Sequence, residues 1–379
     1  MIQEVKAKFV EEFSSKPRTF RSPGRINIIG EHTDYNEGFV LPAAIDKQIV
    51  FAIAPNTCGK FRFCAKDLNE YGEFPYVVEV SQTWANYLLG VIAQIQKRGV
   101  QVPPVDVVFG GNVPLGAGLS SSAALECGFA YALNEIFNFG FSRLELVQMS
   151  QMAEHEFAHV NCGIMDQFAV MFGKKDHVIQ LDCKTLEYQY FPLELHDYTI
   201  LLCNSNVKHE LVSSEYNVRR RETEAGVQVV ASHFPNIHTM RDVTMEQLLQ
   251  CAPEMQGKSF NRCKYVIEEN IRLKRACQAM TEGDIKTVGA MMYGTHEGMS
   301  KLYEASCPEI DVMVEIAKTC DGVVGSRIMG GGFGGCTISL VQNDAVELFK
   351  KRIIAEYYQK YDKTPTIYEV AICDGTSEL

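Results

Sequence analysis

The stretch that most restricts the fold is VPLGAGLSSSAALE, residues 113–126, which reads as a turn from a buried strand (105–109) into an apolar helix. Such a turn exposes backbone N–H groups at the positive end of the helix dipole, and this combination binds phosphate. A Walker-type loop would carry a lysine here, but the position is Ser121 and the next charged residue is Glu126. Positive charge for a phosphate must therefore come from a metal ion or a distant residue. A glycine turn with a serine cap explains the loop equally well.

The length of 379 residues exceeds the usual size of a single core and predicts two domains, 1–200 and 201–379, with the boundary between 190 and 210. Hairpins mixed with helices favour an α+β fold. No apolar run reaches the roughly 18 to 20 residues of a membrane helix. The first residues, MIQEVKAKFVEEF, lack a secretory apolar segment. We therefore expect a cytoplasmic protein without a membrane partner.

The charge and cysteine content exclude other classes of function. A net charge of −11 argues against a nucleic-acid partner. The one dense basic run, residues 219–221, precedes Glu222 and Glu224 and predicts a solvated helix face. The 13 cysteines contain no Cys-x-x-Cys pair, which favours reduced, buried thiols over disulfides or a zinc cluster.

Periodicity along the chain predicts the order of helices and strands. Helices are expected at about 84–98, 122–136, 143–159, 163–172, 213–232, 260–281, 284–302 and 310–319. Strands are expected as a hairpin within 177–194 and at about 198–206, 328–341 and 366–373.

A second glycine-rich stretch, MGGGFGGC at 329–336, has five glycines in eight residues. A tight hairpin needs one or two. Five glycines indicate that the backbone passes close to a ligand or to another segment, although a flexible hairpin is the alternative.

Polar groups cluster in SPGRINIIGEHTDYNEGFVLPAAID, residues 22–46. Glu31, His32 and Asp34 supply three hydrogen-bonding groups in four residues, soon after Arg25. Carboxylates accept hydrogen bonds from hydroxyls, so this set suits a small, uncharged polyol. A solvated loop with a salt bridge is the alternative.

Four motifs in this order, SPGRINIIGEHTDYNEGFVLP, PLGAGLSSSAALE, CGIMDQ and MGGGFGG, strongly resemble the galactokinase family of GHMP small-molecule kinases. The resemblance implies an N-terminal ribosomal-protein-S5-domain-2-like domain and a C-terminal ferredoxin-like domain, with the active site in the cleft between them. It implies ATP-dependent phosphorylation of galactose at the C1 hydroxyl, giving galactose 1-phosphate and ADP, in the Leloir pathway. Kinases of arabinose or N-acetylgalactosamine are close alternatives.

The resemblance also implies roles for particular residues and a monomer that binds galactose and ATP with Mg²⁺. Asp166 would be a general base, or its charge would be held by Arg25 with the sugar proton lost late. The implied residues are Asp166 and Arg25 for catalysis; Glu31, His32, Thr33, Asp34, Gly163 and Tyr216 for the sugar; Gly116, Ala117, Gly118, Leu119, Ser120, Ser121, Ser122 and Trp84 for ATP; and Ser122 and Glu154 for Mg²⁺.

Two rival functions remain. HEFAH, residues 155–159, matches the His-Glu-x-x-His zinc pattern, whose histidines would lie one turn apart on a helix, but no further ligand follows. A non-catalytic sugar sensor would bind the same ligands without turnover.

Overall fold

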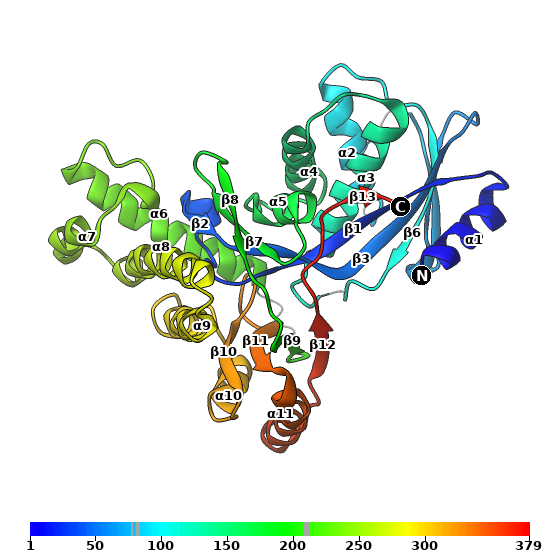
Figure 1. Cartoon of the computed structure of the whole chain (residues 1–379). Helices are drawn as coiled ribbons and strands as arrows, with labels where there is room; N and C mark the ends of the chain where they lie inside the picture. The colour runs from blue at the N-terminus through cyan, green and yellow to red at the C-terminus, as the bar shows by residue number, and fades with distance from the viewer. Residues whose placement is uncertain (77–78, 81–83, 115, 208–211) are drawn as a thin grey trace.

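The computed structural model describes residues 1–76, 79–80, 84–114, 116–207 and 212–379. In the last of these ranges, side chains are described from residue 215 on. Within these residues the strands form sheets of six, four and three strands, in the orders β13-β1-β3-β6-β4-β5, β10-β11-β9-β12 and β2-β7-β8 (Figure 1). The strands are β1 (Arg18–Asn27), β2 (Phe39–Val40), β3 (Pro42–Pro55), β4 (Phe61–Ala65), β5 (Glu70–Phe74), β6 (Val105–Gly111), β7 (His177–Asp182), β8 (Tyr188–Pro192), β9 (Tyr198–Asn204), β10 (Val323–Ile328), β11 (Cys336–Gln342), β12 (Thr366–Val370) and β13 (Ser377–Glu378).

Helices cover the six-stranded sheet on both faces (Figure 1). Helix α1 (Ile2–Phe13) packs Val5 and Phe9 against one face, where Val50 and Val108 are buried. The opposite face of the sheet is covered by α2 (Asn86–Lys97), α3 (Ser121–Phe137), α4 (Arg143–Phe157) and α5 (Met165–Phe172). Because both faces are covered, β1 and β3 are buried along most of their length.

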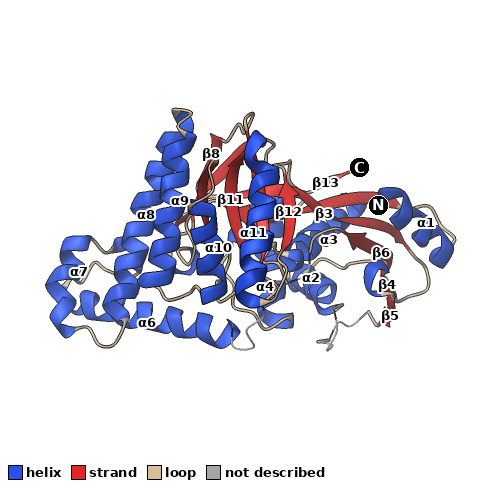
Figure 2. Ribbon diagram, turned by 90° about the horizontal axis from the view of Figure 1, so that it is seen from below, coloured by secondary structure: helices blue, strands red, loops and turns tan. Residues whose placement is uncertain are grey.

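Helices α9, α10 and α11 pack on the four-stranded sheet, whereas α6 and α7 pack on α8, as Figure 2 shows from below. Helices α8 and α9 lie side by side as an antiparallel pair, and α9 packs on β10. The helices of this part of the chain are α6 (Val212–His233), α7 (Met245–Cys251), α8 (Ser259–Thr281), α9 (Ile285–Lys301), α10 (Pro308–Lys318) and α11 (Val346–Tyr361).

The α+β prediction is confirmed, and the last residues of the chain add a feature that the sequence did not predict. The four-stranded sheet begins with β9, close to the expected boundary at residue 200. After β12, however, the chain returns to the other sheet, where β13 pairs antiparallel with β1. The division into 1–200 and 201–379 stays a prediction.

One local interpretation of the sequence was wrong, and the zinc alternative lacks the helical geometry that it needs. Arg219 is only 7% exposed, since its guanidinium donates to the carbonyls of Tyr303 and Glu304, whereas Arg220 does lie on the surface and pairs with Glu224. The zinc pattern also fails, because α4 ends at Phe157 and His159 has a φ of +58° beyond it. No helix in the described part of the chain is long and apolar enough to cross a membrane. All 13 cysteines are free thiols.

Candidate active site

A cavity of about 530 Å³ lies where the end of β1, the segment before α5, the first turns of α6 and the second glycine-rich stretch meet. Its wall includes seven of the residues expected at the sugar and the transferred phosphate, with two glycines from a distant part of the chain. The lining residues used below are Arg25, Glu31, His32, Asp34, Gly163, Asp166, Tyr216, Gly330 and Gly331.

Arg25 and Asp166 form a bidentate ion pair at the cavity wall. Arg25 Nε and Nη2 donate to Asp166 Oδ1 and Oδ2, each at 2.7 Å, and Nη1 donates to the carbonyl of Gly118. Ser120 Oγ also donates to Asp166 Oδ2. A carboxylate has about four lone-pair sites, so one, on Oδ1, has no donor among the described residues. In the same part of the chain, two of the five N–H groups of the guanidinium have no acceptor.

The serine–glycine turn brings this ion pair to the N-terminus of α3. Gly116 and Gly118 have φ values of +71° and +72°, which glycine adopts without steric cost, and Ser120 has a φ of +57°. The side chains of Ala117 and Leu119 are buried in the core, so only their backbones face a ligand. The structure also departs from the expected role of Ser120, because its hydroxyl proton is donated to Asp166 rather than left for a phosphate.

A second cavity, of about 260 Å³, lies on the other side of this turn. Ser121 and Ser122 line it together with Trp84, Tyr87 and Phe109. Aromatic walls beside a helix N-terminus suit a base with its phosphates. Trp84 thus lies beside the serines, and its expected contact with adenine stays a prediction.

Ser122 and Glu154 are the residues expected to hold a cation, and their surroundings fit a hard divalent ion. Glu154 is 7% exposed and accepts from Gln167 Nε2 at 2.7 Å, and burial raises the pKa of its carboxyl. One helical turn after Ser122, Glu126 is fully buried, and neither of its carboxylate oxygens has a hydrogen-bond partner among the described residues. Burial, then the charge of Glu154, raises the pKa of Glu126. Two buried carboxyls beside a hydroxyl form the oxygen-rich surroundings that Mg²⁺ prefers.

Glu31 has a partner that the sequence did not reveal. Its Oε1 accepts from Arg327 Nη2 at 3.0 Å and from the backbone N–H of Gly330 at 2.8 Å. Arg327 is fully buried and also donates to the carbonyls of Ile28 and Ile328. The pair is separated by 296 residues, so no local pattern could have indicated it.

Thr33 is not among the residues that line the first cavity, which corrects its expected role in sugar binding. The residue is fully buried, and its Oγ1 points back into the loop, within 2.8 Å of the carbonyl oxygen of Gly30 and 2.5 Å of that of Phe39. The left-handed conformation of His32, with a φ of +58°, turns the chain so that Thr33 faces inward. Thr33 therefore shapes the loop that carries its neighbours.

Asp34 and Gly163 touch across the cavity. A Cβ on Gly163 would overlap the Asp34 carboxylate, which explains why a glycine stands at this position. Burial raises the pKa of Asp34 to about 6, and the charges of Asp166 and Glu31 act in the same direction. Backbone N–H groups of Tyr35 and Asp34 act against this shift by hydrogen-bonding the carboxylate, and no side chain of the described residues donates to it, so it can also accept from a ligand.

Gly163→Ala is expected to raise the KM for the sugar that the resemblance implies by about tenfold or more, because an inserted methyl group typically costs about 1–3 kcal/mol where the site cannot relax. The added Cβ displaces the Asp34 carboxylate. Steady-state kinetics with each substrate varied in turn checks this, and the KM for the nucleotide and the melting temperature serve as controls. An unchanged KM for the sugar would contradict the assigned contact.

Lowering the pH from about 8 to about 5 is expected to raise the KM for the sugar by about tenfold, because the Asp34 carboxyl, with a pKa of about 6, is then about nine-tenths protonated. The neutral acid accepts hydrogen bonds from sugar hydroxyls more weakly than the carboxylate does. The sign follows from the raised pKa, since the ionised form is present above about pH 6 and lost below it. Asp34→Asn should have a higher KM that lacks this pH step.

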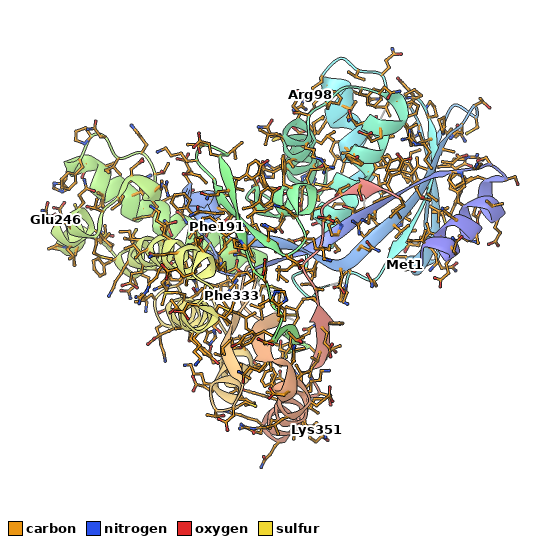
Figure 3. All side chains as sticks on the ribbon, in the orientation of Figure 1. Met1, Arg98, Phe191, Glu246, Phe333 and Lys351 are labelled. Atoms are coloured by element: carbon orange, nitrogen blue, oxygen red, sulfur yellow. The ribbon has the colours of Figure 1, made fainter. Side chains whose placement is uncertain are left out.

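Tyr216 and the second glycine-rich stretch close the cavity. The Tyr216 ring lies 5.2 Å from that of His32, between centroids. A Cβ on Gly332 would collide with the carbonyl oxygen of Ala305, and Phe333, labelled near the centre of the molecule in Figure 3, packs under the Arg219 guanidinium at 5.3 Å. The expectation that this backbone passes close to another segment is confirmed.

Comparison with known proteins agrees with this geometry. A galactokinase galactose-binding signature matches residues 7–55, and models of the GHMP kinase N-terminal domain and C-terminal region match 86–174 and 274–360. Galactokinases of Thermosipho africanus and Thermotoga neapolitana are 42% and 45% identical over 95% of this chain and 99% of theirs. The Lactococcus lactis galactokinase complexed with galactose has a TM-score of 0.95 and 33% identity, covering 100% of this chain and 99% of that one. The Methanococcus jannaschii mevalonate kinase shares the fold, with a TM-score of 0.66 at 17% identity.

The two-domain fold and the two cavities, one lined by Asp166 and the other by Ser121 and Ser122, define a small-molecule kinase of the GHMP class. Kinases of this class take ATP together with a divalent metal ion. Within that class, the chain belongs to the galactokinase family.

Proposed function

We propose that the chain transfers the γ-phosphoryl group of ATP to the C1 hydroxyl of galactose, giving galactose 1-phosphate and ADP. The observation that carries this proposal is the position of the Arg25–Asp166 ion pair, which lies between a carboxylate-lined cavity and the α3 N-terminus. The first cavity suits an uncharged polyol and the second suits a nucleotide. This reaction begins galactose catabolism by the Leloir pathway.

Asp166 orients the attacking hydroxyl and receives its proton in the proposed mechanism. The free lone-pair site on Oδ1 accepts from the C1 hydroxyl, and the carboxylate takes the proton as the phosphoryl group moves. Arg25 fixes the carboxylate through two hydrogen bonds and turns its two remaining N–H groups toward the phosphoryl oxygens. Phosphoryl transfer depends mainly on such positioning and charge stabilisation.

The cation at this site is proposed to be Mg²⁺, held by Ser122 and Glu154. When bound, it neutralises charge on the phosphates, which replaces the lysine of a Walker-type loop. The support is the oxygen-only donor set behind the turn, in which Glu126 provides a further buried carboxyl.

Galactose is the proposed sugar because Glu31, Asp34 and Asp166 offer acceptors from three sides of one cavity. Sites built to hydrogen-bond a hydroxyl discriminate by about 10⁴ or more against an analogue that leaves those groups unpaired. An ADP-release assay with galactose, glucose, arabinose, N-acetylgalactosamine and mevalonate tests this. We expect the highest kcat/KM with galactose. Turnover with none of these compounds would instead favour a sensor that binds without catalysis.

One copy of the chain supplies every residue proposed for the site, which supports a monomer as the working unit. The free thiols support a reducing compartment, and we propose the cytoplasm.

A further inference from the structure

A chain of hydrogen bonds runs along the wall of the sugar cavity. The hydroxyl oxygens of Tyr303 and Tyr35 lie 2.7 Å apart, and the Tyr35 hydroxyl lies 2.8 Å from Nδ1 of His32. The other ring nitrogen of His32, Nε2, lies 3.1 Å from the carbonyl oxygen of Gly331. Tyr303 follows α9 and Gly331 belongs to the second glycine-rich stretch, so the chain of bonds joins three segments that are far apart in the sequence.

The chemistry of these groups determines which atom donates and which accepts in each hydrogen bond. The Gly331 carbonyl can only accept, so His32 Nε2 must carry a hydrogen. Burial lowers the pKa of His32 to about 3, so the ring is neutral and Nδ1 is bare. Tyr35 must then donate to Nδ1, and Tyr303 must donate to Tyr35.

Aromatic rings hold the imidazole in this orientation. The ring centroids of Tyr303, Tyr216 and Tyr35 lie 4.8, 5.2 and 5.8 Å from that of His32. His32 is 5% exposed and adopts a φ of +58°, a conformation that non-glycine residues keep only where neighbours enforce it. The ring therefore has little freedom to turn away from either partner.

We propose that Tyr35 and Tyr303 are positioning residues of the sugar site: their hydroxyls act in series to hold the His32 ring through Nδ1, so that its Nε2–H ties Gly331 to the cavity wall. The inference rests on the proposed function, since its consequence is measured as galactose binding. Beside Gly331, the backbone of Gly330 holds Glu31 Oε1 at 2.8 Å, so releasing this stretch also disturbs a carboxylate proposed to bind the sugar.

Removal of the Tyr35 hydroxyl leaves His32 Nδ1 buried without a donor. The Gly331 carbonyl still keeps the proton on Nε2, but the imidazole loses one of its two hydrogen bonds and is free to turn, which loosens the Nε2–H contact with Gly331. Tyr303→Phe should have a similar but smaller effect, because it acts through Tyr35. Tyr293→Phe is a matched control, since the Tyr293 hydroxyl on α9 is buried and has no hydrogen-bond partner among the described residues.

The experiment combines kinetics with nitrogen NMR of isotope-labelled histidine, in which the His32 signals are assigned by their loss in His32→Gln. In the unaltered protein we expect a protonated Nε2 and a bare Nδ1. In Tyr35→Phe we expect Nε2 to stay protonated, the Nδ1 signal to move to the position of an imidazole nitrogen without a hydrogen bond, and the KM for galactose to rise by about tenfold. The KM for ATP should change by less than about threefold in both tyrosine variants, and Tyr293→Phe should match the unaltered protein.

Two results would overturn the proposal: a His32 proton on Nδ1 in the unaltered protein, or a galactose KM in folded Tyr35→Phe equal to that of Tyr293→Phe. The NMR result on the free protein does not depend on catalysis. A protein without galactose turnover but with the expected His32 signals would therefore contradict the proposed function and leave the tautomer assignment standing.

Discussion

Asp166→Asn is expected to lower kcat by about 10² to 10⁴, the usual contribution of a general base, with little change in the KM for ATP. Asparagine fills the same volume but cannot take the proton of the C1 hydroxyl. It also replaces one oxygen that accepts from Arg25 with an NH₂ donor, so the two parallel bonds at 2.7 Å cannot both persist.

Steady-state kinetics at saturating galactose and ATP measures kcat and so checks this prediction. Asp321→Asn, at an exposed aspartate before β10, is the matched control and should retain full turnover. If Asp166→Asn kept more than about a tenth of normal turnover, the general-base role would be untenable and the charge-holding role of Arg25 would remain.

Arg25→Lys is expected to lower kcat by about 10² to 10³, the loss typical for one preorganised donor to developing charge. Arginine reaches both Asp166 oxygens and the Gly118 carbonyl simultaneously, which a single ammonium group cannot do in the same planar geometry. The variant keeps the positive charge, so a loss of activity measures the loss of geometry.

Arg221→Lys, at an exposed position on α6, is the matched control. It separates the loss of geometry at Arg25 from any effect of replacing a guanidinium with an ammonium group elsewhere in the protein. Melting temperature is needed as a second readout, because Arg25 is 5% exposed and its replacement can also destabilise the fold. Turnover within about threefold of normal would show that the bidentate geometry is not required.

The sequence predicted the periodic elements well. Helices α3, α4 and α8 begin and end within about two residues of the expected bounds, since their apolar faces repeat at helical spacing. Strand β5, with the sequence EYGEF, was missed because it lies at a sheet edge and is largely exposed, so it lacks a buried face. Helix α7 spans only seven residues, too few for a periodic signal.

Within the site, motifs predicted which residues meet but not how each side chain points. Arg25, Asp34, Gly163 and Asp166 do converge on one cavity. The inward orientation of Thr33 depends on the turn at His32, and the partner of Glu31 comes from β10. Arg219 was misjudged because its neighbours in sequence are charged, while the carbonyls that it binds lie more than 80 residues away.

Incubation of the purified protein with galactose and ATP labelled in the γ-phosphate follows the phosphoryl group directly. The geometry around Asp166 predicts that the label moves to the sugar in an amount equal to the ADP formed, and that phosphorus NMR locates it on the C1 oxygen. Label released only as inorganic phosphate, or found on another hydroxyl, would contradict an attack from C1 at the Arg25–Asp166 pair.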